Sequence, residues 1–490
     1  MGALPMPASP LLSTIPQPPP HKRPILALAS TTHSTFLDLK PETKPEPLTA
    51  DLRWHDPSDR AEYDVAIIGC GPAGLRLAEQ VSARWSAART LCIDPSPLSA
   101  WPNNYGAWVD EFASLGSGLE SCLDVTWPYA SVYFDGRDAP PKRLARPYAR
   151  VSRGALKALL LENCASQGVR FHAARAWKVL HDEEGLRSTV SCSDGREVRA
   201  RLVVDASGFG SPFIGYDAPQ RTPRAGYQIA HGVLAEVEAH PFVLDEMVLM
   251  DWRDEHLGCE PDMRARNDAH PTFLYVMPFD EKLIFLEETS LVSRPAVAYK
   301  EVKARMAARL RHMGIRVKRV LEEEKCLIPM GGPLPRMPQS VLGIGGSAGL
   351  VHPSTGYMVS RALAMAPIVA EAIGECLGST RMIRGRRLHE RVWGGLWTKE
   401  RRLAREFYCF GMETLLELDL EGTRRFFEAF FELEEEQWHG FLSSRLTIGE
   451  LAWLGLSLFG KASSGCKVDM VTKCPLPLVR MAGNLVSEVL

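Results

Sequence analysis

The segment YDVAIIGCGPAG, residues 63–74, decides the fold of this chain. Its first half, Tyr63–Ile68, is a short apolar run with β-branched residues, which predicts a buried strand, and the pattern after the segment predicts a helix. Between the two, Gly69, Gly71 and Gly74 form the pattern G-x-G-x-x-G. In this context the first glycine permits a tight turn and the second lets the backbone approach a pyrophosphate. The third lets helix and strand pack closely, and the helix N-terminus offers free N–H groups to the phosphates.

A second strand, residues 90–93, ends in Asp94 and completes a β-α-β unit. A carboxylate at that place accepts hydrogen bonds from ribose hydroxyls and disfavours a 2′-phosphate. The unit therefore predicts an adenine dinucleotide site, with an accidental glycine turn as the alternative. The fingerprint alone does not separate NAD from FAD.

Two later segments favour FAD. LVVDASGFGS (residues 202–211, with Asp205) and VLGIGGSAGLVHPSTGYM (residues 341–358) resemble the second and third nucleotide motifs of the glutathione-reductase-like flavoproteins. That resemblance implies that residues 345–349 face the pyrophosphate and ribityl chain and that residues 352–356 line the isoalloxazine. It also places Arg153, in VSRGAL, near the cofactor. The candidate cofactor-binding residues are thus Gly69, Gly71, Gly74, Asp94, Arg153, Asp205, Gly345, Gly346, Gly349, His352 and Gly356.

The third motif departs from the broad flavoprotein pattern at one position. Gly346 stands where those proteins have an aspartate after the glycine, so a ribityl hydrogen bond is either lost or supplied from elsewhere, for example by Ser347. His352, Ser354 and Thr355 also fit a second interpretation, in which they cap a loop instead of touching the flavin.

The expected fold class is α/β, a Rossmann-like FAD-binding flavoprotein with a mixed or antiparallel substrate sheet and a helical C-terminal region. We expect a discontinuous FAD-binding domain (60–225 and 335–380), a substrate-binding sheet region (226–334) and a helical region (381–490).

Residues 1–55 are rich in Pro, Ser and Thr, and no acidic residue precedes Asp38. This composition is typical of an organelle transit peptide, with a disordered tail as the alternative. We expect the mature chain to begin between about residues 40 and 60, with order starting at Tyr63.

Composition excludes several classes. The net charge of −2 in 490 residues gives no electrostatic case for nucleic acid. The eleven cysteines contain no CxxC pair, so we expect reduced thiols and no metal site. No apolar run reaches the roughly 18 to 20 residues of a membrane-spanning helix. The run Leu446–Phe459 is either a core helix or a helix that lies on a membrane surface.

Five stretches go beyond any generic flavoprotein: WPNNYGAWVDEF (101–112), MVLMDWRD (247–254), FLEETSLVSRP (285–295), IPMGGPLP (328–335) and GYMVSRALAMAP (356–367). From about residue 60 onward they resemble the plant lycopene β-cyclases. CLGSTRMIRG (376–385) and TKCPLPLVR (472–480) are similar to the chromoplast branch, which includes the capsanthin/capsorubin synthases. The resemblance implies a plastid enzyme, peripheral to a membrane, that acts on a carotenoid. It also implies reduced FAD as the active cofactor, NADPH as its reductant, and other carotenoid enzymes as possible partners.

Ring closure of lycopene needs a proton on the terminal alkene, capture of the carbocation by the neighbouring double bond, and removal of a proton from the new ring. The protein must supply an acid, a base and surfaces that tolerate a cation.

On a strand, Glu287 shares a face with Phe285 and Thr289, whereas Glu288 follows two aliphatic residues and fits a salt bridge or a strand end. We therefore expect Glu287 to be the acid, with Glu288 and Asp251 as further catalytic candidates. The other interpretation of Asp251 is an ion pair with Arg253 or Arg294, and that of both glutamates is solvated charge. Asp110 and Glu111 are further candidates for the base, and Trp101, Tyr105, Trp108, Trp252 and Tyr275 are candidates for shielding cations or for ordinary core packing.

Three alternatives stay open. The same acid serves protonation of a 5,6-epoxide followed by ring contraction to a κ-ring ketone, the capsanthin/capsorubin synthase reaction. A flavin monooxygenase or dehydrogenase would consume NADPH stoichiometrically, and the missing aspartate and the FLEET segment argue against it. A non-catalytic scaffold that organises carotenoid enzymes is the third.

Overall fold

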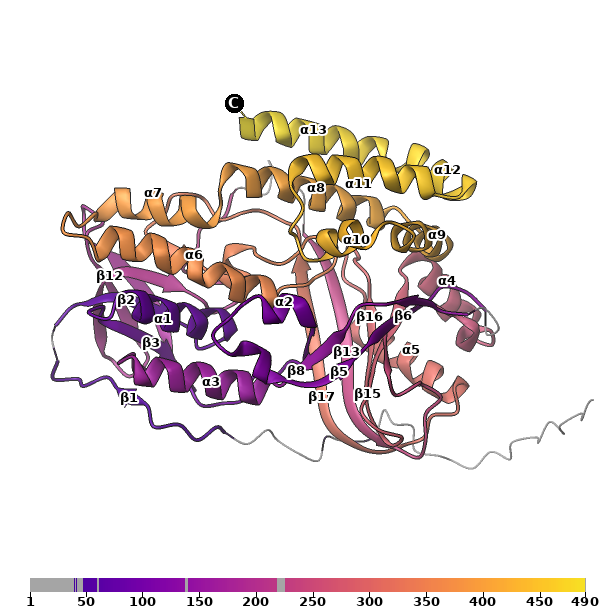
Figure 1. Cartoon of the computed structure of the whole chain (residues 1–490), viewed down its shortest axis with the longest axis horizontal. Coiled ribbons are helices and arrows are strands. Elements are labelled where there is room, and N and C mark those ends of the chain that lie inside the picture. The colour runs from indigo at the N-terminus through magenta and orange to yellow at the C-terminus, as the bar shows by residue number, and fades with distance from the viewer. Residues whose placement is uncertain are drawn as a thin grey trace, which may run out of the picture.

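The computed structural model describes residues 39, 41, 47–59, 61–136, 140–217 and 225–489, with side chains to residue 485. Two sheets lie side by side and a layer of C-terminal helices runs over both (Figure 1). The chain enters the second sheet at residues 129–144 and again after residue 225, and it returns to the first sheet at residue 341.

The first sheet is mainly parallel and carries the dinucleotide motifs. Its strand β2 (Tyr63–Ile68) is buried along its whole length because helices cover the sheet. Helix α1 (Pro72–Arg84) packs against both α3 (Arg153–Ser166) and α6 (Val359–Leu377). The strand order is β1 (Arg53–Trp54), β9 (Arg170–Ala173), β3 (Thr90–Asp94), β2, β12 (Glu197–Asp205), β11 (Ser188–Cys192) and β10 (Ala176–His181), with β18 (Val341–Gly343) beside β12.

The second sheet has seven strands, and most neighbours are antiparallel. In order they are β17 (Val317–Met330), β13 (Gly226–Val237), β16 (Leu283–Ser290), β15 (Thr272–Pro278), β14 (Glu246–Asp251), β6 (Tyr129–Tyr133) and β7 (Lys142–Leu144). Helix α5 (Tyr299–His312) covers one face, where Met306 and Leu310 pack with Val233 and Leu286. The opposite face points toward the first sheet and the C-terminal helices.

The predicted boundary of the FAD-binding domain needs a correction here. Strands β6 and β7 fall inside 60–225, yet they extend the second sheet because β6 pairs in parallel with β14. A small third sheet lies between the two and contains β4 (Tyr105–Trp108), β8 (Tyr148–Val151) and β5 (Leu123–Trp127). The short helices α2 (Val109–Ala113) and η2 (Leu119–Cys122) connect β4 to β5. The segment from 101 to 151 therefore links the two halves of the molecule.

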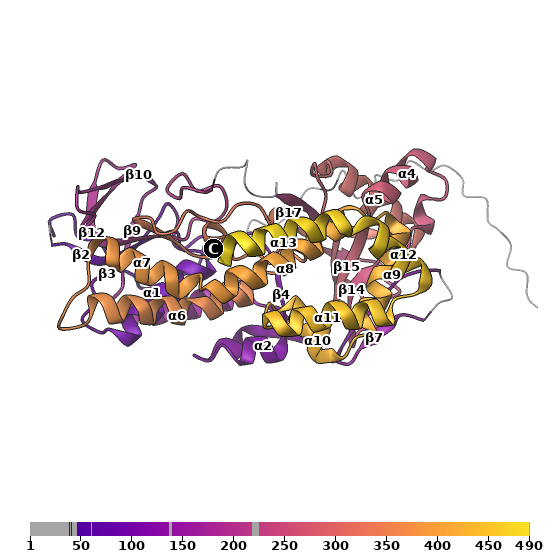
Figure 2. The ribbon, with the colours of Figure 1, turned by 90° about the horizontal axis from the view of Figure 1, so that it is seen from above.

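The chain is helical after β18, as predicted for 381–490. The helices α8, α11 and α13 lie next to one another over the second half of the molecule (Figure 2). Their bounds and those of the remaining helices are η3 (Glu255–Leu257), α4 (Pro261–Ala269), η4 (Gly345–Ala348), α7 (Gly385–Leu396), α8 (Lys399–Leu416), α9 (Leu420–Phe431), α10 (Glu435–Leu442), α11 (Ile448–Lys461), α12 (Ser464–Lys473) and α13 (Pro475–Val489). Among the described residues, none of these helices combines the length and apolarity needed to cross a membrane.

The ordered part of the chain begins earlier than predicted. Most of the expected leader, residues 1–38, lies outside the described residues. Leu52, however, is 5% exposed, β1 pairs with β9, and the N–H of Leu48 donates to the Leu98 carbonyl at 2.8 Å. The expectation of a leader that reaches residue 55 is therefore wrong for its last residues, because an apolar side chain and a strand pair hold them to the first sheet.

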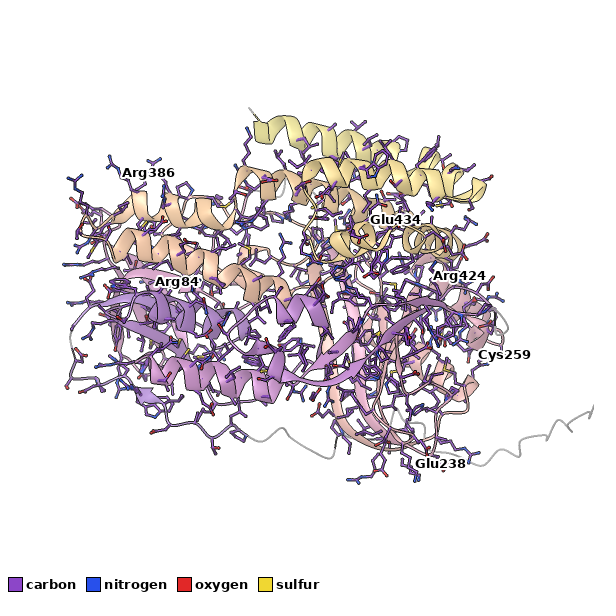
Figure 3. The ribbon with its side chains drawn as sticks, in the orientation of Figure 1. Arg84, Glu238, Cys259, Arg386, Arg424 and Glu434 are labelled. Atoms are coloured by element: carbon purple, nitrogen blue, oxygen red, sulfur yellow. The ribbon has the colours of Figure 1, made fainter. Side chains whose placement is uncertain are left out.

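All eleven cysteines are free, and most of them are buried. Cys259, which stands near the end of the second sheet in Figure 3, is the exposed one. The charged side chains labelled in Figure 3, such as Arg386 and Glu238, project from the surface of the molecule.

Candidate active site between the two sheets

The glycines of the first motif have the geometry that the sequence predicted. Gly69 has φ +107°, and a Cβ there would stand 2.7 Å from the carbonyl oxygen of Ala206. A Cβ on Gly74 would meet the Gly69 carbonyl oxygen at 2.1 Å, so helix α1 packs on the turn at a distance that only glycine allows. Gly71 lines an open cavity at the N-terminus of α1. The turn thus leaves an unobstructed backbone surface at a helix N-terminus, which suits a pyrophosphate.

Asp94 lies at the carboxyl end of β3, in the wall of the same cavity. Its Oδ2 accepts a hydrogen bond from the Cys70 N–H at 2.9 Å, and its Oδ1 accepts one from the Ser96 N–H at 2.7 Å. These bonds fix the carboxylate and leave further lone pairs for ribose hydroxyls. Lys157 on α3, which the sequence reasoning did not single out, also lines this end and donates to the Ser99 carbonyl at 2.6 Å.

The third motif completes the cradle with Gly345 and Gly346, which both line the cavity. Ser347 does not supply the missing ribityl contact. Its hydroxyl is fully buried and donates to the carbonyl of Asp205 at 2.6 Å, with the carbonyl of Ile344 at 3.0 Å. The serine therefore ties the third motif to the second.

Asp205, Gly349, Arg153 and His352, four of the predicted cofactor residues, are not part of the cavity lining. Asp205 accepts from the Ser207 N–H at 3.0 Å and so shapes the second motif. Gly349, with φ +71°, ends the turn of the third motif. Arg153 bridges the Pro102 carbonyl (3.1 Å) and Glu322 (2.6 Å).

His352 is fully buried, and its Nε2 lies 2.9 Å from the Phe441 carbonyl, while its Nδ1 accepts from the Ser354 N–H at 3.1 Å. Burial lowers the pKa of His352 to about 3, so the ring is neutral. This geometry is that of a loop cap. Gly356 does line the cavity, together with Ser354, Thr355 and Tyr357.

A single cavity of about 1200 Å³ runs from this cradle to the second sheet. The volume exceeds the range of about 300–1,000 Å³ that is usual for one small-molecule site. Its far end is lined by Phe273, Phe285 and Leu291, and by Phe427 and Leu442 from the C-terminal helices. The cavity can therefore hold a dinucleotide at one end and an apolar molecule at the other.

Two carboxyl groups face this cavity from the second sheet. Glu287 on β16 and Glu324 on β17 both line it, and both are opposite Gly232 on the intervening strand β13. Residues directly opposite in antiparallel strands point to the same face. Tyr275 on β15 is opposite Glu287 and extends the row. The row contains the predicted acid and one residue, Glu324, that the sequence reasoning missed.

The two glutamates differ in their hydrogen-bond partners. Oε2 of Glu324 accepts from the backbone N–H of Asn104 at 2.7 Å and from its side-chain amide at 3.2 Å. Glu287 is hydrogen-bonded to Glu324 itself. Donors of this kind favour an ionised Glu324, and the neighbouring carboxyl favours a protonated Glu287.

Burial, and then the neighbouring Glu324, raise the pKa of Glu287 well above its usual range. Burial also raises the pKa of Glu324, while the bonds from Glu287 and Asn104 and the charge of Arg153 act in the opposite direction. Two carboxyl groups this close cannot both ionise readily. These effects favour a state in which the pair carries one proton.

Glu288 and Asp251 lie on the other side of the sheet, in a buried ion-pair network. Arg309 of α5 donates from Nε to Glu288 at 2.8 Å, and its Nη1 stands 3.9 Å from Asp251. Arg253 makes a bidentate contact with Asp251 at 2.8 and 2.5 Å. Both carboxylates are fully buried. The alternation of FLEET thus separates a cavity-facing Glu287 from an ion-paired Glu288, as the strand pattern predicted, and Asp251 pairs with Arg253.

The aromatic residues named from the sequence divide in the same way. Trp101, Tyr105, Trp108 and Tyr275 line the cavity. Trp252 is a core residue that packs against Phe273 and Phe427, with ring centroids 4.6 and 5.5 Å away. Cation-tolerant ring faces therefore surround the carboxyl pair.

The remaining carboxylate candidates lie beside this cavity. Glu111 accepts from the hydroxyl of the cavity residue Tyr357 at 2.8 Å and lies 2.9 Å from His439. Asp110 forms an ion pair with Arg146 at the surface. Glu111 thus orients a wall residue, and Asp110 is solvated.

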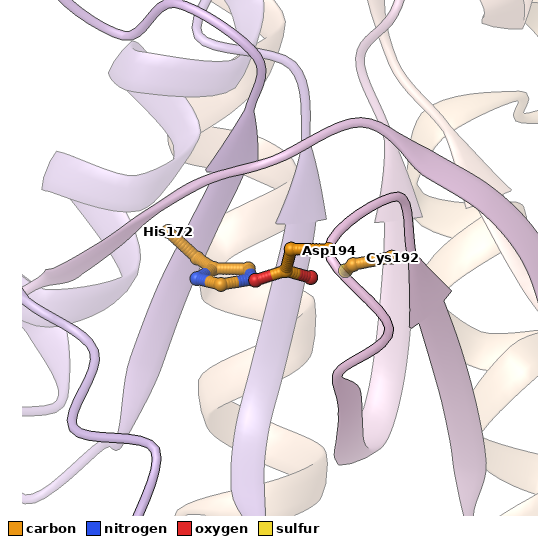
Figure 4. A group of neighbouring side chains, drawn as sticks. All are labelled: His172, Cys192 and Asp194. Carbon is orange, nitrogen blue, oxygen red and sulfur yellow. The ribbon is translucent and has the colours of Figure 1, made fainter.

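His172, Cys192 and Asp194 form a separate cluster at the edge of the first sheet (Figure 4). His172 Nε2 lies 3.2 Å from Asp194, which Arg196 also contacts at 3.5 Å. Burial raises the pKa of the Cys192 thiol to about 11. These contacts connect β9 to the turn that follows β11.

The fold resembles that of flavoproteins with solved structures. A geranylgeranyl bacteriochlorophyll reductase-like protein from Thermoplasma acidophilum aligns with 86% of this chain and 99% of its own, with a TM-score of 0.58 and 14% identity. The halogenase PltM, solved in complex with phloroglucinol and FAD, aligns with 87% of this chain and 95% of its own, with a TM-score of 0.51 and 14% identity. These similarities show that the chain shares the α/β fold of these proteins, which confirms the predicted fold class.

Residues 64–467 match the family described as lycopene cyclase protein, and the chain belongs to that family. It is 64% identical to a capsanthin/capsorubin synthase, chromoplastic, of Citrus sinensis over 94% of this chain and 90% of the relative. Over the same shares it is 61% identical to a neoxanthin synthase, chloroplastic, of Solanum lycopersicum. It is 54% identical to a lycopene beta cyclase, chloroplastic, of an Oncidium hybrid cultivar over 93% of each chain. The family resemblance inferred from FLEET and its companion segments is confirmed.

Proposed function

We propose that this chain closes β-rings on lycopene in a redox-neutral, proton-initiated reaction, with Glu287 as the acid. The observation that carries the proposal is the position of the Glu287 carboxyl group, which faces an aromatic cavity beside Glu324, and this cavity continues from a dinucleotide cradle. Burial and the neighbouring Glu324 raise the pKa of Glu287 well above its usual range, which favours the protonated form. An alkene is a weak base, so its protonation requires an acid that is held next to it and away from water.

The residues of the cavity have distinct parts in this reaction. Glu287 transfers its proton to the terminal alkene, the neighbouring double bond forms a carbon–carbon bond to the resulting cation, and a carboxylate removes a proton from the new ring. One proton enters and one leaves, so no oxidation occurs. The faces of Tyr275 and Phe285 stabilise the cation. The Tyr275 hydroxyl donates to that of Tyr148 at 3.3 Å, which keeps the ring of Tyr275 in place.

The cradle fits FAD. Gly71, Gly345 and Gly346 leave room for the pyrophosphate, and Asp94 is fixed for ribose hydroxyls. Reduced flavin bound there would supply negative charge near the cavity that stabilises a cation. We infer that NADPH serves only to reduce the flavin and is not consumed in proportion to product.

A second candidate function is conversion of antheraxanthin or violaxanthin to κ-ring ketones. The relative that is 64% identical carries the name capsanthin/capsorubin synthase, which favours it. The chemistry begins with the same acid, because an epoxide oxygen is a more basic acceptor than an alkene. We place it second because β-ring closure is the reaction of the wider family that the chain resembles.

We further propose a plastid location at a membrane surface. The relatives described above are named chloroplastic or chromoplastic. Helix α11 buries Leu451, Leu454 and Leu458 and leaves Trp453, Leu456 and Phe459 exposed by 64, 68 and 43%. Further exposed apolar residues on the next two helices are Val468, Val471, Leu476, Leu478 and Val479. A surface of this kind suits the boundary of a bilayer, and Leu442, just before α11, lines the apolar end of the cavity.

The substrate test uses two assays. The chain is expressed in bacteria that accumulate lycopene, and purified holoprotein is supplied with violaxanthin in lipid vesicles. We expect β-carotene in the first assay and little or no κ-ring ketone in the second. Red κ-ring products with little β-carotene would reverse the order of the two functions.

The membrane surface is tested by vesicle sedimentation. Replacing Trp453, Leu456 and Phe459 with Ser is expected to weaken binding, while the control change of the exposed Val243 and Leu244 to Ser leaves it unaltered. Equal binding by both variants would contradict the assignment.

A further inference from the structure

We propose that Glu287 and Glu324 act as one proton-sharing pair, in which Glu324 is the carboxylate that takes the proton from the new ring, and that Gly232 is the positioning residue that lets them meet. The inference rests on the proposed function for its substrate. It adds the base of the reaction and the reason for a glycine in the middle of the second sheet.

The first argument is the register of three strands. Glu287 and Glu324 belong to β16 and β17, which are not neighbours, because β13 lies between them. Both glutamates are paired with the same residue, Gly232. Two side chains on either side of a central strand are normally separated by the side chain of that strand. Here the central position has none, and the two carboxyl groups are hydrogen-bonded across it.

The second argument is the space above Gly232. A Cβ at this position would stand 2.7 Å from Cγ of Glu324, 3.0 Å from its Oε1 and 2.8 Å from Cζ of Phe285. Distances under about 3 Å require the neighbours to move. Gly232 lies inside strand β13 and does not have the positive φ that would by itself require a glycine. The glycine is therefore explained by the close approach of the pair.

The third argument is the different anchoring of the two groups. Asn104, from the WPNNYG segment, donates twice to Oε2 of Glu324. That leaves Glu287 to hold the proton and Glu324 to hold the charge. After Glu287 has given its proton to the alkene, the second carboxylate lies beside the cation. It removes the ring proton, and exchange of the proton of the pair with solvent before the next ring closure restores the starting state, with Glu287 protonated.

The groups that face the pair are consistent with this assignment. Tyr105, Tyr148, Tyr275 and Cys326 stay neutral because burial raises the pKa of each. The positive charge of Arg153 lowers the pKa of Glu324, and Arg153 is itself paired with Glu322. Lys325, the next residue on β17, also lines the cavity and lies 3.9 Å from Glu323. These two cations are therefore paired with carboxylates other than Glu287 and Glu324.

The test compares Glu324→Gln and Gly232→Ala with Glu323→Gln as the matched control. Glu323 precedes Glu324 on the same strand and pairs with Lys303 at 3.1 Å. Turnover depends on a protonated Glu287, so it falls as the pH rises through the pKa of the pair. Without the neighbouring charge this pKa is lower, and the alkaline limb of the pH–rate profile of Glu324→Gln should move to lower pH by about one unit or more. Gly232→Ala should move it in the same direction with folding and flavin content retained, and Glu323→Gln should leave it in place.

An infrared titration gives a readout that needs no turnover. In the purified holoprotein the C=O band of a protonated carboxyl group should persist above the ordinary range of glutamate, and should disappear at lower pH in Glu324→Gln. If lycopene is cyclised while neither the band nor the alkaline limb moves in Glu324→Gln, the pair is refuted and the proposed function stands. If the band moves in Glu324→Gln but the unmodified chain converts neither lycopene nor an epoxide, the pair stands and the proposed function fails.

Discussion

Exchange of Glu287 or Glu288 for glutamine separates catalysis from stability at adjacent positions. In Glu287→Gln the amide keeps the shape of the side chain and can still hydrogen-bond to Glu324, but it has no proton to transfer. A general acid contributes about 10²- to 10⁴-fold to a rate. Because water has little access to an apolar cavity, we expect turnover to fall by at least this factor, with flavin content and unfolding midpoint close to those of the unmodified chain.

Glu288→Gln has the opposite expected profile. The side chain of Arg309 is 2% exposed, and the substitution removes its 2.8 Å partner. Glutamine keeps one of the two oxygens that accept from Arg309 but loses the charge, so the remaining carboxylate near Arg309 is the more distant Asp251, at 3.9 Å. Removal of one member of a buried ion pair costs about 3–5 kcal/mol of stability. We expect a clear loss of unfolding free energy, with turnover per folded molecule largely retained.

The assay measures lycopene conversion in lipid vesicles, flavin absorbance and denaturant unfolding for both variants and the unmodified chain. Turnover must be normalised to folded, flavin-containing protein, because Glu288→Gln reduces the amount of it. Equal loss of turnover from both changes in folded protein would refute the separation of roles. So would substantial activity in Glu287→Gln.

Three further outcomes follow from the structure. Deleting residues 1–38 should leave unfolding unaltered, whereas deleting 1–55 should lower the unfolding midpoint because it removes Leu39, Leu52 and β1; equal midpoints would contradict this. Gly74→Ala should abolish FAD binding, measured by flavin absorbance of the purified protein, because its Cβ would meet the Gly69 carbonyl at 2.1 Å; full occupancy would show that α1 can shift. Ser347→Ala should keep its flavin but lose about 1 kcal/mol of unfolding free energy in urea, because the hydrogen bond from the serine hydroxyl to the Asp205 carbonyl is lost. Loss of flavin with unchanged stability would instead indicate a direct contact between Ser347 and the cofactor.

Local patterns predicted the parts of the site that depend on neighbouring residues in the sequence. Gly69 and Gly74 act within one strand-turn-helix unit, and the alternation of FLEET placed Glu287 and Glu288 on opposite faces, since side-chain direction in a strand has a period of two. Pairing between distant strands has no such local signal. Glu324 lies in the run EEEK, where it looks like one of several solvated charges, and only the shared partner Gly232 brings it to Glu287.

Flavoprotein resemblance placed motifs more reliably than individual side chains. Ser347 and His352 lie in the correct loop, yet their polar atoms satisfy backbone carbonyl and N–H groups because the loop is buried. The same demand for buried hydrogen bonds explains why Arg153 contacts Pro102 and Glu322. The end of the leader was misplaced because Leu48 and Leu52 are isolated apolar residues in a polar sequence, and their burial depends on tertiary packing.

The most direct test of the proposed function is the mass of the product formed by purified, flavin-reduced protein from lycopene in heavy water. The proton that starts ring closure comes from a carboxyl group that exchanges with solvent, and the proton that is removed comes from a different carbon of the substrate. The account predicts a cyclic isomer of lycopene that carries one deuterium for each ring formed, with no NADPH consumed in proportion to product. A product that has gained oxygen or lost hydrogen, or a ring without deuterium, would contradict it.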